Sequence, residues 1–114
     1  MPNSRRAVLR LQAAYYLSTG LWPLVSRRAF ERVTGPKIDW WLVQMVGLLA
    51  AAIGASLAVG SRDEPPSPAV RTLAISAAAS FAAIDVVHSL RGRISKVYLG
   101  DAAVEIGFIA VLLC

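Results

Sequence analysis

The sequence predicts an all-α membrane protein: a bundle of four transmembrane helices with a short interfacial helix between the first two. Hydrophobic residues make up 56% of the chain and the mean hydropathy is +0.56, both high for a soluble domain of 114 residues. The apolar residues form four long runs, and charged residues gather in the short segments between them, as in helices surrounded by lipid. A single integral membrane domain is therefore expected over residues 1–114.

The first predicted span, residues 7–25, is the most polar of the four. Arg10 and Gln12 interrupt its apolar stretch and no small-residue cleavage site follows, so we expect a retained helix rather than a signal peptide. Tyr15 and Tyr16 lie near its middle, where a phenol hydroxyl needs a hydrogen-bond acceptor. At least one of these tyrosines is expected to face the inside of the bundle.

The segment over residues 26–37 is too polar to span a membrane. Ser26 is suited to cap a short helix whose arginines point to lipid headgroups, and the Gly35-Pro36 pair is expected to end it. Asp39 is a suitable N-cap for the next helix, and the Trp40-Trp41 pair is typical of an aromatic anchor at the interface. We therefore predict a helix that lies on the membrane surface.

The second, third and fourth spans are predicted over residues 40–60, 68–90 and 95–114. Ser67-Pro68 indicates an N-cap followed by a first-turn proline, and Ser95 is the expected cap of the last span. Small residues recur four apart on the second and third spans, which lets another helix approach closely. The residues expected to pack in this way are Gly47, Ala51, Gly54, Ala74 and Ala78.

Residues able to carry chemistry gather near the connection between the third and fourth spans. Asp85 and His88 lie near the end of the third span, and Asp101 and Glu105 lie near the start of the fourth. Gln44 enters the second span from the same side. Because the connection is short and basic, these side chains are expected in one leaflet, as a polar pocket that opens towards the basic face.

Several interpretations of this pocket stay open. Carboxylates near lipid are costly unless they are paired, protonated or in use. The acids either fix the hairpin through hydrogen bonds, or exchange protons with Glu105 as the deepest acid and His88 as its partner. His88 is also a candidate ligand for a tetrapyrrole. A divalent-metal site of Asp85, His88 and Glu105 has suitable ligand types but no supporting spacing, so no metal is predicted.

The net charge of +5 comes from Lys and Arg at the ends of the apolar runs, where these residues meet lipid headgroups. This placement argues against nucleic-acid binding. The positive-inside rule favours both termini outside the membrane. The single cysteine, Cys114, excludes an intrachain disulfide. The candidate headgroup contacts are Arg27, Arg28, Arg32, Arg91, Arg93 and Lys96.

Two stretches of the chain carry a resemblance to known proteins. They are GLWPLVSRRAFERVTGPKIDWWLVQMV at residues 20–46 and DVVHSLRGRISKVYLGDAAVE at residues 85–105. Together they resemble a group of small, uncharacterised four-helix bacterial membrane proteins, whose general plan is similar to DoxX-like bundles. The resemblance implies a four-helix fold in the bacterial cytoplasmic (inner) membrane, and it implies no activity. The pocket is also similar in composition to sterol isomerases of the emopamil-binding type, without a match of their motif.

The leading functional prediction is a non-catalytic accessory or scaffolding subunit that packs against other membrane helices. It depends on the small-residue faces, which offer more close-packing surface than a bundle of this size needs. The alternative is a membrane enzyme or carrier for a lipid-soluble molecule, a quinone or an isoprenoid, that uses the Asp, His and Glu side chains. A pigment-binding subunit is the third. Expected partners are membrane lipids and either other membrane subunits or a second copy, and no cofactor is predicted beyond the tetrapyrrole and quinone alternatives.

Overall fold

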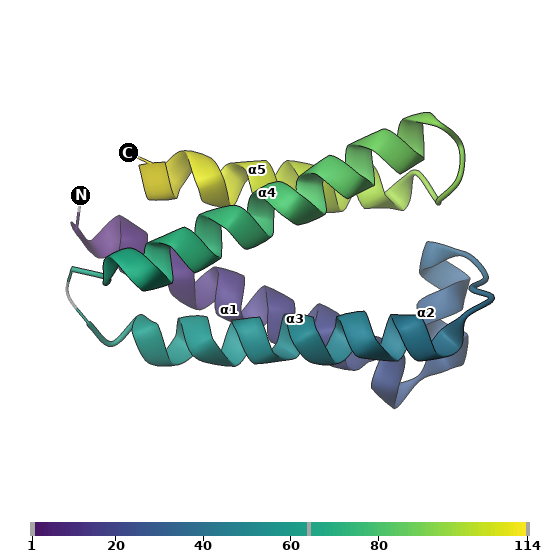
Figure 1. The fold of residues 1–114 in the computed structure, drawn as a ribbon, viewed down its shortest axis with the longest axis horizontal. Coiled ribbons are helices and arrows are strands. Elements are labelled where there is room, and N and C mark those ends of the chain that lie inside the picture. The colour runs from purple at the N-terminus through teal and green to yellow at the C-terminus, as the bar shows by residue number, and fades with distance from the viewer. Residues whose placement is uncertain (1, 64, 114) are drawn as a thin grey trace.

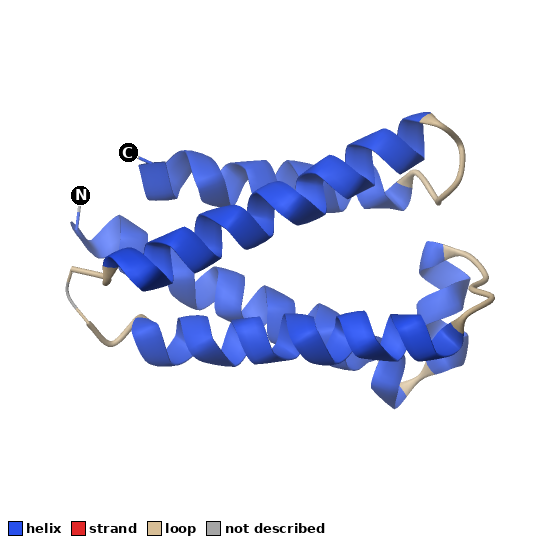
Figure 2. Cartoon of the chain, viewed as in Figure 1, coloured by secondary structure: helices blue, strands red, loops and turns tan. Residues whose placement is uncertain are grey.

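The computed structural model describes residues 2–63 and 65–113, which contain five α-helices and no β-strand (Figures 1 and 2). The all-α prediction is therefore confirmed, while Cys114, the predicted end of the fourth span, lies outside the described residues. The helices are α1 (Pro2–Val25), α2 (Arg27–Thr34), α3 (Trp40–Gly60), α4 (Pro68–Leu90) and α5 (Val97–Leu113).

The four long helices form two close pairs, α1 with α3 and α4 with α5 (Figure 1). Packing between the pairs is sparser, and it runs mainly between α1 and α5 and between α3 and α4. Both described chain ends and the α3–α4 turn lie at one end of the molecule, on the left in Figure 1. The short helix α2 and the α4–α5 connection lie at the other end, and the molecule is 42 Å long.

Two of the helices are long and apolar enough to cross a membrane. They are α3, with 21 residues, and α4, with 23. At 1.5 Å per residue, α3 spans about 31 Å, close to the thickness of a bilayer's hydrocarbon core. Helix α5 has only 17 described residues, and α1 carries Arg5, Arg6, Arg10 and Gln12 in its first half. Length and composition thus support two of the four predicted spans.

The predicted caps explain where the helices begin and end. Ser26 and Ser67 cap α2 and α4, and each side-chain oxygen accepts a 3.2 Å hydrogen bond from the backbone N–H three residues later. Gly35 ends α2 with a φ of 95°, in the region that favours glycine. Asp39 occupies the N-cap position of α3, but its side chain makes no capping hydrogen bond. Ser95 accepts from the N–H of Val97, the residue at which α5 begins.

Glycines set the close approach of α1 and α3. A Cβ placed on Gly20 would lie 2.5 Å from the carbonyl oxygen of Gly47, and a Cβ on Gly54 would lie 2.8 Å from the carbonyl oxygen of Ala13. Both positions are therefore backbone-to-backbone contacts that no larger residue fits. The buried face of α3 consists of Gly47, Ala50, Ala51, Gly54, Leu57 and Gly60.

The α4 stripe is built in the same way from alanines. Ala74 and Ala78 are fully buried, and Ala82 is nearly so. The stripe continues in the same direction with two polar residues, Asp85 and Ser89, which are also buried. The side of α4 that packs inside the molecule is therefore apolar in its first half and polar in its second.

The substitution Gly47→Ala is expected to destabilise the α1–α3 pair by about 1–3 kcal/mol, because the new methyl group overlaps the backbone of α1. The free energy of unfolding in mixed detergent and SDS micelles, followed by circular dichroism, measures the effect. Gly107→Ala is the matched control, since its Cβ would meet nothing within 4 Å. The control is expected to gain up to about 1 kcal/mol from helix propensity. Equal effects of the two substitutions would contradict the close approach.

Candidate functional site

A group of polar side chains is enclosed where α1, α4 and α5 meet. We call it the acid–tyrosine cluster. It combines two tyrosines and an amide from α1 with three carboxyl groups from α4 and α5. Its members are Gln12, Tyr15, Tyr16, Asp85, Asp101 and Glu105.

The spacing of residues along α1 and α5 places each tyrosine opposite one acid. Asp101 and Glu105 are four residues apart and share one face of α5. Tyr16 donates a hydrogen bond from its hydroxyl to Glu105, at 2.8 Å from Oε1 and 3.2 Å from Oε2. Tyr15 donates to Oδ1 of Asp101. Each carboxyl group of α5 is thus held by a phenol from α1.

Gln12 connects the same tyrosine to the third helix. Its Nε2 donates to the hydroxyl oxygen of Tyr16 at 3.0 Å and to the carbonyl oxygen of Ala74 in α4 at 2.9 Å. The side chain is fully buried. Its Oε1 meets no hydrogen-bond donor among the described residues. Gln12 therefore links α1 to α4 through its amide nitrogen and leaves one buried acceptor open.

Asp85 is the carboxyl group that α4 contributes. It is only 6% exposed, and its carboxyl group faces that of Asp101 across the contact of α4 with α5. Its Oδ2 meets no donor among the described residues. Among the described residues, no Lys, Arg or His forms an ion pair with any of the three acids. The cluster thus collects acids without a basic partner.

Aromatic rings enclose the tyrosine end of the cluster. Tyr15 packs edge-on against Phe108 of α5, with ring centroids 5.9 Å apart. Tyr16 packs in the same way against Phe81 of α4, at 5.4 Å. Tyr16 is 2% exposed and Glu105 is not exposed at all. The hydrogen bonds of Tyr16 therefore lie in an apolar setting, where an unmade bond costs more than it does in water.

The structure brings together three of the five residues predicted for the pocket. Asp85, Asp101 and Glu105 meet in the cluster. Gln44 does not, because its side chain is exposed and α3 packs along α1 rather than α5. His88 is half-buried, and its side chain makes no hydrogen bond to the described acids. The polar contribution predicted from the second span, Gln44, is therefore replaced by contacts from the first.

Sequence reasoning left three cluster members out of the predicted pocket. Gln12, Tyr15 and Tyr16 all come from α1, the most polar of the predicted spans. A signal was present, since a phenol at mid-depth needs an acceptor and the acids of the fourth span are strong acceptors. To pair the tyrosines with these acids, one must know that α1 lies beside α5, and the sequence does not show which helices are neighbours.

The predicted headgroup contacts lie at the end of the molecule that holds α2 and the α4–α5 connection (Figure 1). All six side chains are exposed. Arg27 also pairs with Glu31 at 3.0 Å and lies 4.6 Å from the ring centroid of Trp40. The other five are Arg28, Arg32, Arg91, Arg93 and Lys96. The basic residues of two separate connections thus gather at one end of the molecule.

Lys37 ties this basic end together. Its backbone N–H donates to Oε2 of Glu31 at 2.6 Å, and this bond is the main reason that the pKa of Glu31 lies below its ordinary value. Its ammonium group donates to the carbonyl oxygens of Thr34 and Gly35, each at 2.9 Å, which caps α2. The same group lies 5.5 Å from the ring centroid of Tyr98 in α5. Partial burial lowers the pKa of Lys37.

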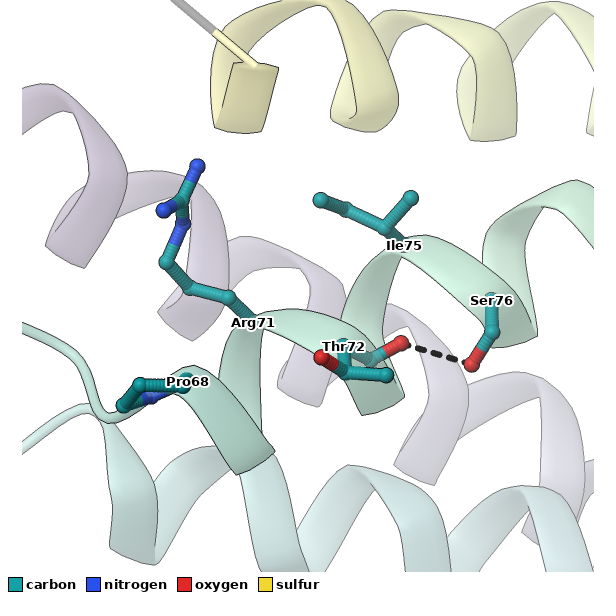
Figure 3. A pocket seen from close by; sticks show the side chains of 5 residues that line it. All are labelled: Pro68, Arg71, Thr72, Ile75 and Ser76. Atoms are coloured by element: carbon teal, nitrogen blue, oxygen red, sulfur yellow. Dashed lines mark hydrogen bonds between the residues drawn. The ribbon is translucent and has the colours of Figure 1, made fainter.

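Two open hollows lie towards the opposite end of the molecule. The first has a volume of about 360 Å³ and follows one face of α4 (Figure 3), where it is lined by Pro68, Arg71, Thr72, Ile75 and Ser76. Arg71 donates from Nη2 to the carbonyl oxygen of Leu112 at 2.9 Å and so caps the last turn of α5. The second, of about 640 Å³, lies between α3 and the start of α4. Neither hollow is lined by a residue of the acid–tyrosine cluster.

Among the described residues, no group of three or more His, Cys, Asp or Glu side chains is arranged to hold a metal ion. The fold and the cluster together define a class, an all-α protein with two helices able to cross a membrane and a polar cluster enclosed by three helices. Comparisons with protein-family models, curated proteins and solved structures find no match to this chain. Its function is therefore argued from geometry.

The bond between Tyr16 and Glu105 is expected to stabilise the fold measurably. Tyr16→Phe removes the donor to Glu105 and the acceptor of Gln12, so it is expected to cost about 1–3 kcal/mol of unfolding free energy. A double-mutant cycle with Glu105→Met is expected to give a coupling energy of about 0.5–3 kcal/mol. The control cycle pairs Tyr16→Phe with Asp63→Asn, an exposed acid, and is expected to be additive. Additivity in both cycles would refute the link.

Proposed function

We propose that this chain is a small integral membrane protein in which α1, α3, α4 and α5 all cross the bilayer, and that it acts as a non-catalytic accessory or scaffolding subunit. The observation that carries the proposal is the use of the acids. Asp101 and Glu105 already accept hydrogen bonds from Tyr15 and Tyr16 within the chain. They act as an internal clamp between helices.

The exposed surface of α3 supports a lipid environment. A core helix of a soluble protein would be mostly buried, whereas only 22% of the apolar stretch of α3 is buried inside the molecule. Large apolar side chains at its first half are exposed: Trp41, Leu42, Met45, Val46, Leu48 and Leu49. A continuous apolar surface of this kind is stable against lipid and unfavourable against water.

A face of small residues on α4 supports association with another helix. Ser76, Ala79, Ser80 and Ala83 follow helical spacing and are all exposed. The serine hydroxyls donate back to carbonyl oxygens one turn earlier, Ser76 at 2.6 Å and Ser80 at 2.8 Å. Their polar groups are therefore satisfied within α4, and the face offers close van der Waals packing to a neighbouring membrane helix.

The carrier alternative would need space for a lipid-soluble molecule beside the acids. The two hollows instead lie towards the N-terminal half of α4, whereas Asp85 lies in its C-terminal half. The pigment alternative depends on His88, whose side chain lies outside the cluster. We therefore favour the accessory role, in which the acids hold the helices together. The resemblance to DoxX-like bundles is in keeping with the four-span arrangement.

We propose the orientation in which both termini are outside and the basic end is inside. Single cysteines in a Cys114→Ser background test it with a membrane-impermeant maleimide on sealed vesicles. Ser4→Cys and Asp63→Cys are expected to label from the outside, and Arg28→Cys and Arg93→Cys only after the membrane is opened. Labelling of residues 4 and 63 from different sides would show that α1 and α3 do not both cross.

The accessory role is tested by purification from native membranes in a mild detergent, followed by mass analysis of the proteins that travel with the chain. A stoichiometric membrane partner is expected with the wild type. Ala79→Leu is expected to reduce its recovery at least about tenfold, because a larger side chain on the small-residue face prevents close approach. A chain that travels alone as a colourless monomer would count against the proposal.

A matched substitution separates loss of the partner from loss of the fold. Ala103 is an equally exposed alanine on α5, so Ala103→Leu is expected to retain the partner in full. An absorption spectrum of the same fractions tests the pigment alternative, since a bound tetrapyrrole would absorb visible light. Equal recovery of the partner with both leucine variants would place the contact elsewhere on the molecule.

A further inference from the structure

The three acids of the cluster carry more negative charge than their surroundings can balance. Asp85 and Glu105 are buried, and Asp101 is half-buried. The groups that face them are Gln12, Tyr15 and Tyr16 from α1 and Tyr98 from α5. His88 lies one turn beyond Asp85 on α4, outside the cluster. None of the described Lys or Arg side chains pairs with them. Three charged carboxylates in such a setting would repel one another at low dielectric.

Hydrogen bonds from tyrosine stabilise negative charge on two of the three acids. Asp101 and Glu105 each accept a bond from a tyrosine hydroxyl. A tyrosine hydroxyl has one proton to donate, so these two carboxyl groups act as acceptors. Among the described residues, none gives Asp85 such a bond, and its Oδ2 is a buried acceptor without a donor.

Asp85 and Asp101 face each other as two hydrogen-bond acceptors. Both are carboxyl groups and Asp85 is buried, and two carboxylates cannot form a hydrogen bond unless one of them carries a proton. Without a proton, the carboxyl group of Asp85 is a buried acceptor that lacks a donor. With a proton, it can donate a hydrogen bond to Asp101. The same proton removes one of the two facing charges.

We propose that Asp85 and Asp101 form a proton-binding site in which one proton, carried by Asp85, is shared across the contact between α4 and α5. Asp101 is then fixed from two directions, by Tyr15 from α1 and by Asp85 from α4. The proton therefore joins α4 to α5 within one helix pair, at the carboxyl group that Tyr15 of α1 also holds. This inference shares the acids of the cluster with the accessory role, but it concerns what the cluster binds rather than what the outer surface contacts.

Infrared spectroscopy of the wild type in lipid nanodiscs tests the site directly. A protonated carboxyl group gives a C=O stretching band that shifts in D₂O and is absent from carboxylates. The wild type at neutral pH is expected to show this band, and the band is expected to bleach as the pH is raised and the proton is lost. Absence of the band at neutral pH in the folded wild type would overturn the proposal without any variant.

Two substitutions assign the band. Asp85→Asn keeps the shape of the side chain and donates to Asp101 through its amide, so the variant is expected to fold and to lose the band. Glu105→Gln is expected to keep it, as is Asp39→Asn, which changes an exposed acid outside the cluster. A band that survives Asp85→Asn, or that disappears in Glu105→Gln, would place the proton on another group and refute the assignment.

Stability against pH provides a second readout. In the wild type, loss of the proton leaves two facing negative charges, so the unfolding free energy is expected to fall as the pH rises through the bleaching of the band. Asp85→Asn has no proton to lose at this contact and is expected to show a flatter profile over the same range. Parallel profiles for the two proteins would contradict a proton that joins α4 to Asp101.

Discussion

The fold depends on the hydrogen bonds that Tyr15 and Tyr16 of α1 make to the acids of α5. Two well-packed pairs, α1 with α3 and α4 with α5, would otherwise meet over a limited area. In an apolar interior an acid without a donor is costly, so the phenols and carboxyl groups specify one another. Gln12 extends the link to the backbone of α4. Helix α1 is therefore central, although its composition is the least typical of a membrane span.

The two sides of α1 use different physics. Towards α3, Gly20 meets Gly47 backbone to backbone, and the contact is close packing that needs no polar group. Towards α5 and α4, the contact is a polar cluster enclosed by Phe81 and Phe108. Packing by small residues is tolerant of direction, whereas hydrogen bonds between single donors and acceptors fix rotation and register. We infer that the second contact sets how the two pairs of helices are placed against each other.

Strong local signals made much of the fold predictable. The bounds of α3 and α4 agree with residues 40–60 and 68–90, because long apolar runs end at Gly, Pro and Ser residues whose roles are local. Asp85, Asp101 and Glu105 were predicted as neighbours because a short connection joins their helices. Gln44 was expected beside them and is exposed instead. Its depth along the helix axis followed from the sequence, but the direction of its side chain depended on which helix α3 would pack against.

The sequence by itself determined the helices, the serine caps, the gathering of basic residues at one end and the presence of acids near one connection. These features follow from residue type and from spacing of a few positions, so they need no knowledge of neighbours. Only the tertiary structure decided that α1, rather than α3, brings its polar face to the acids. The physical reason is that the partner of a buried donor is fixed by helix adjacency, and Tyr16 and Glu105 are 89 residues apart.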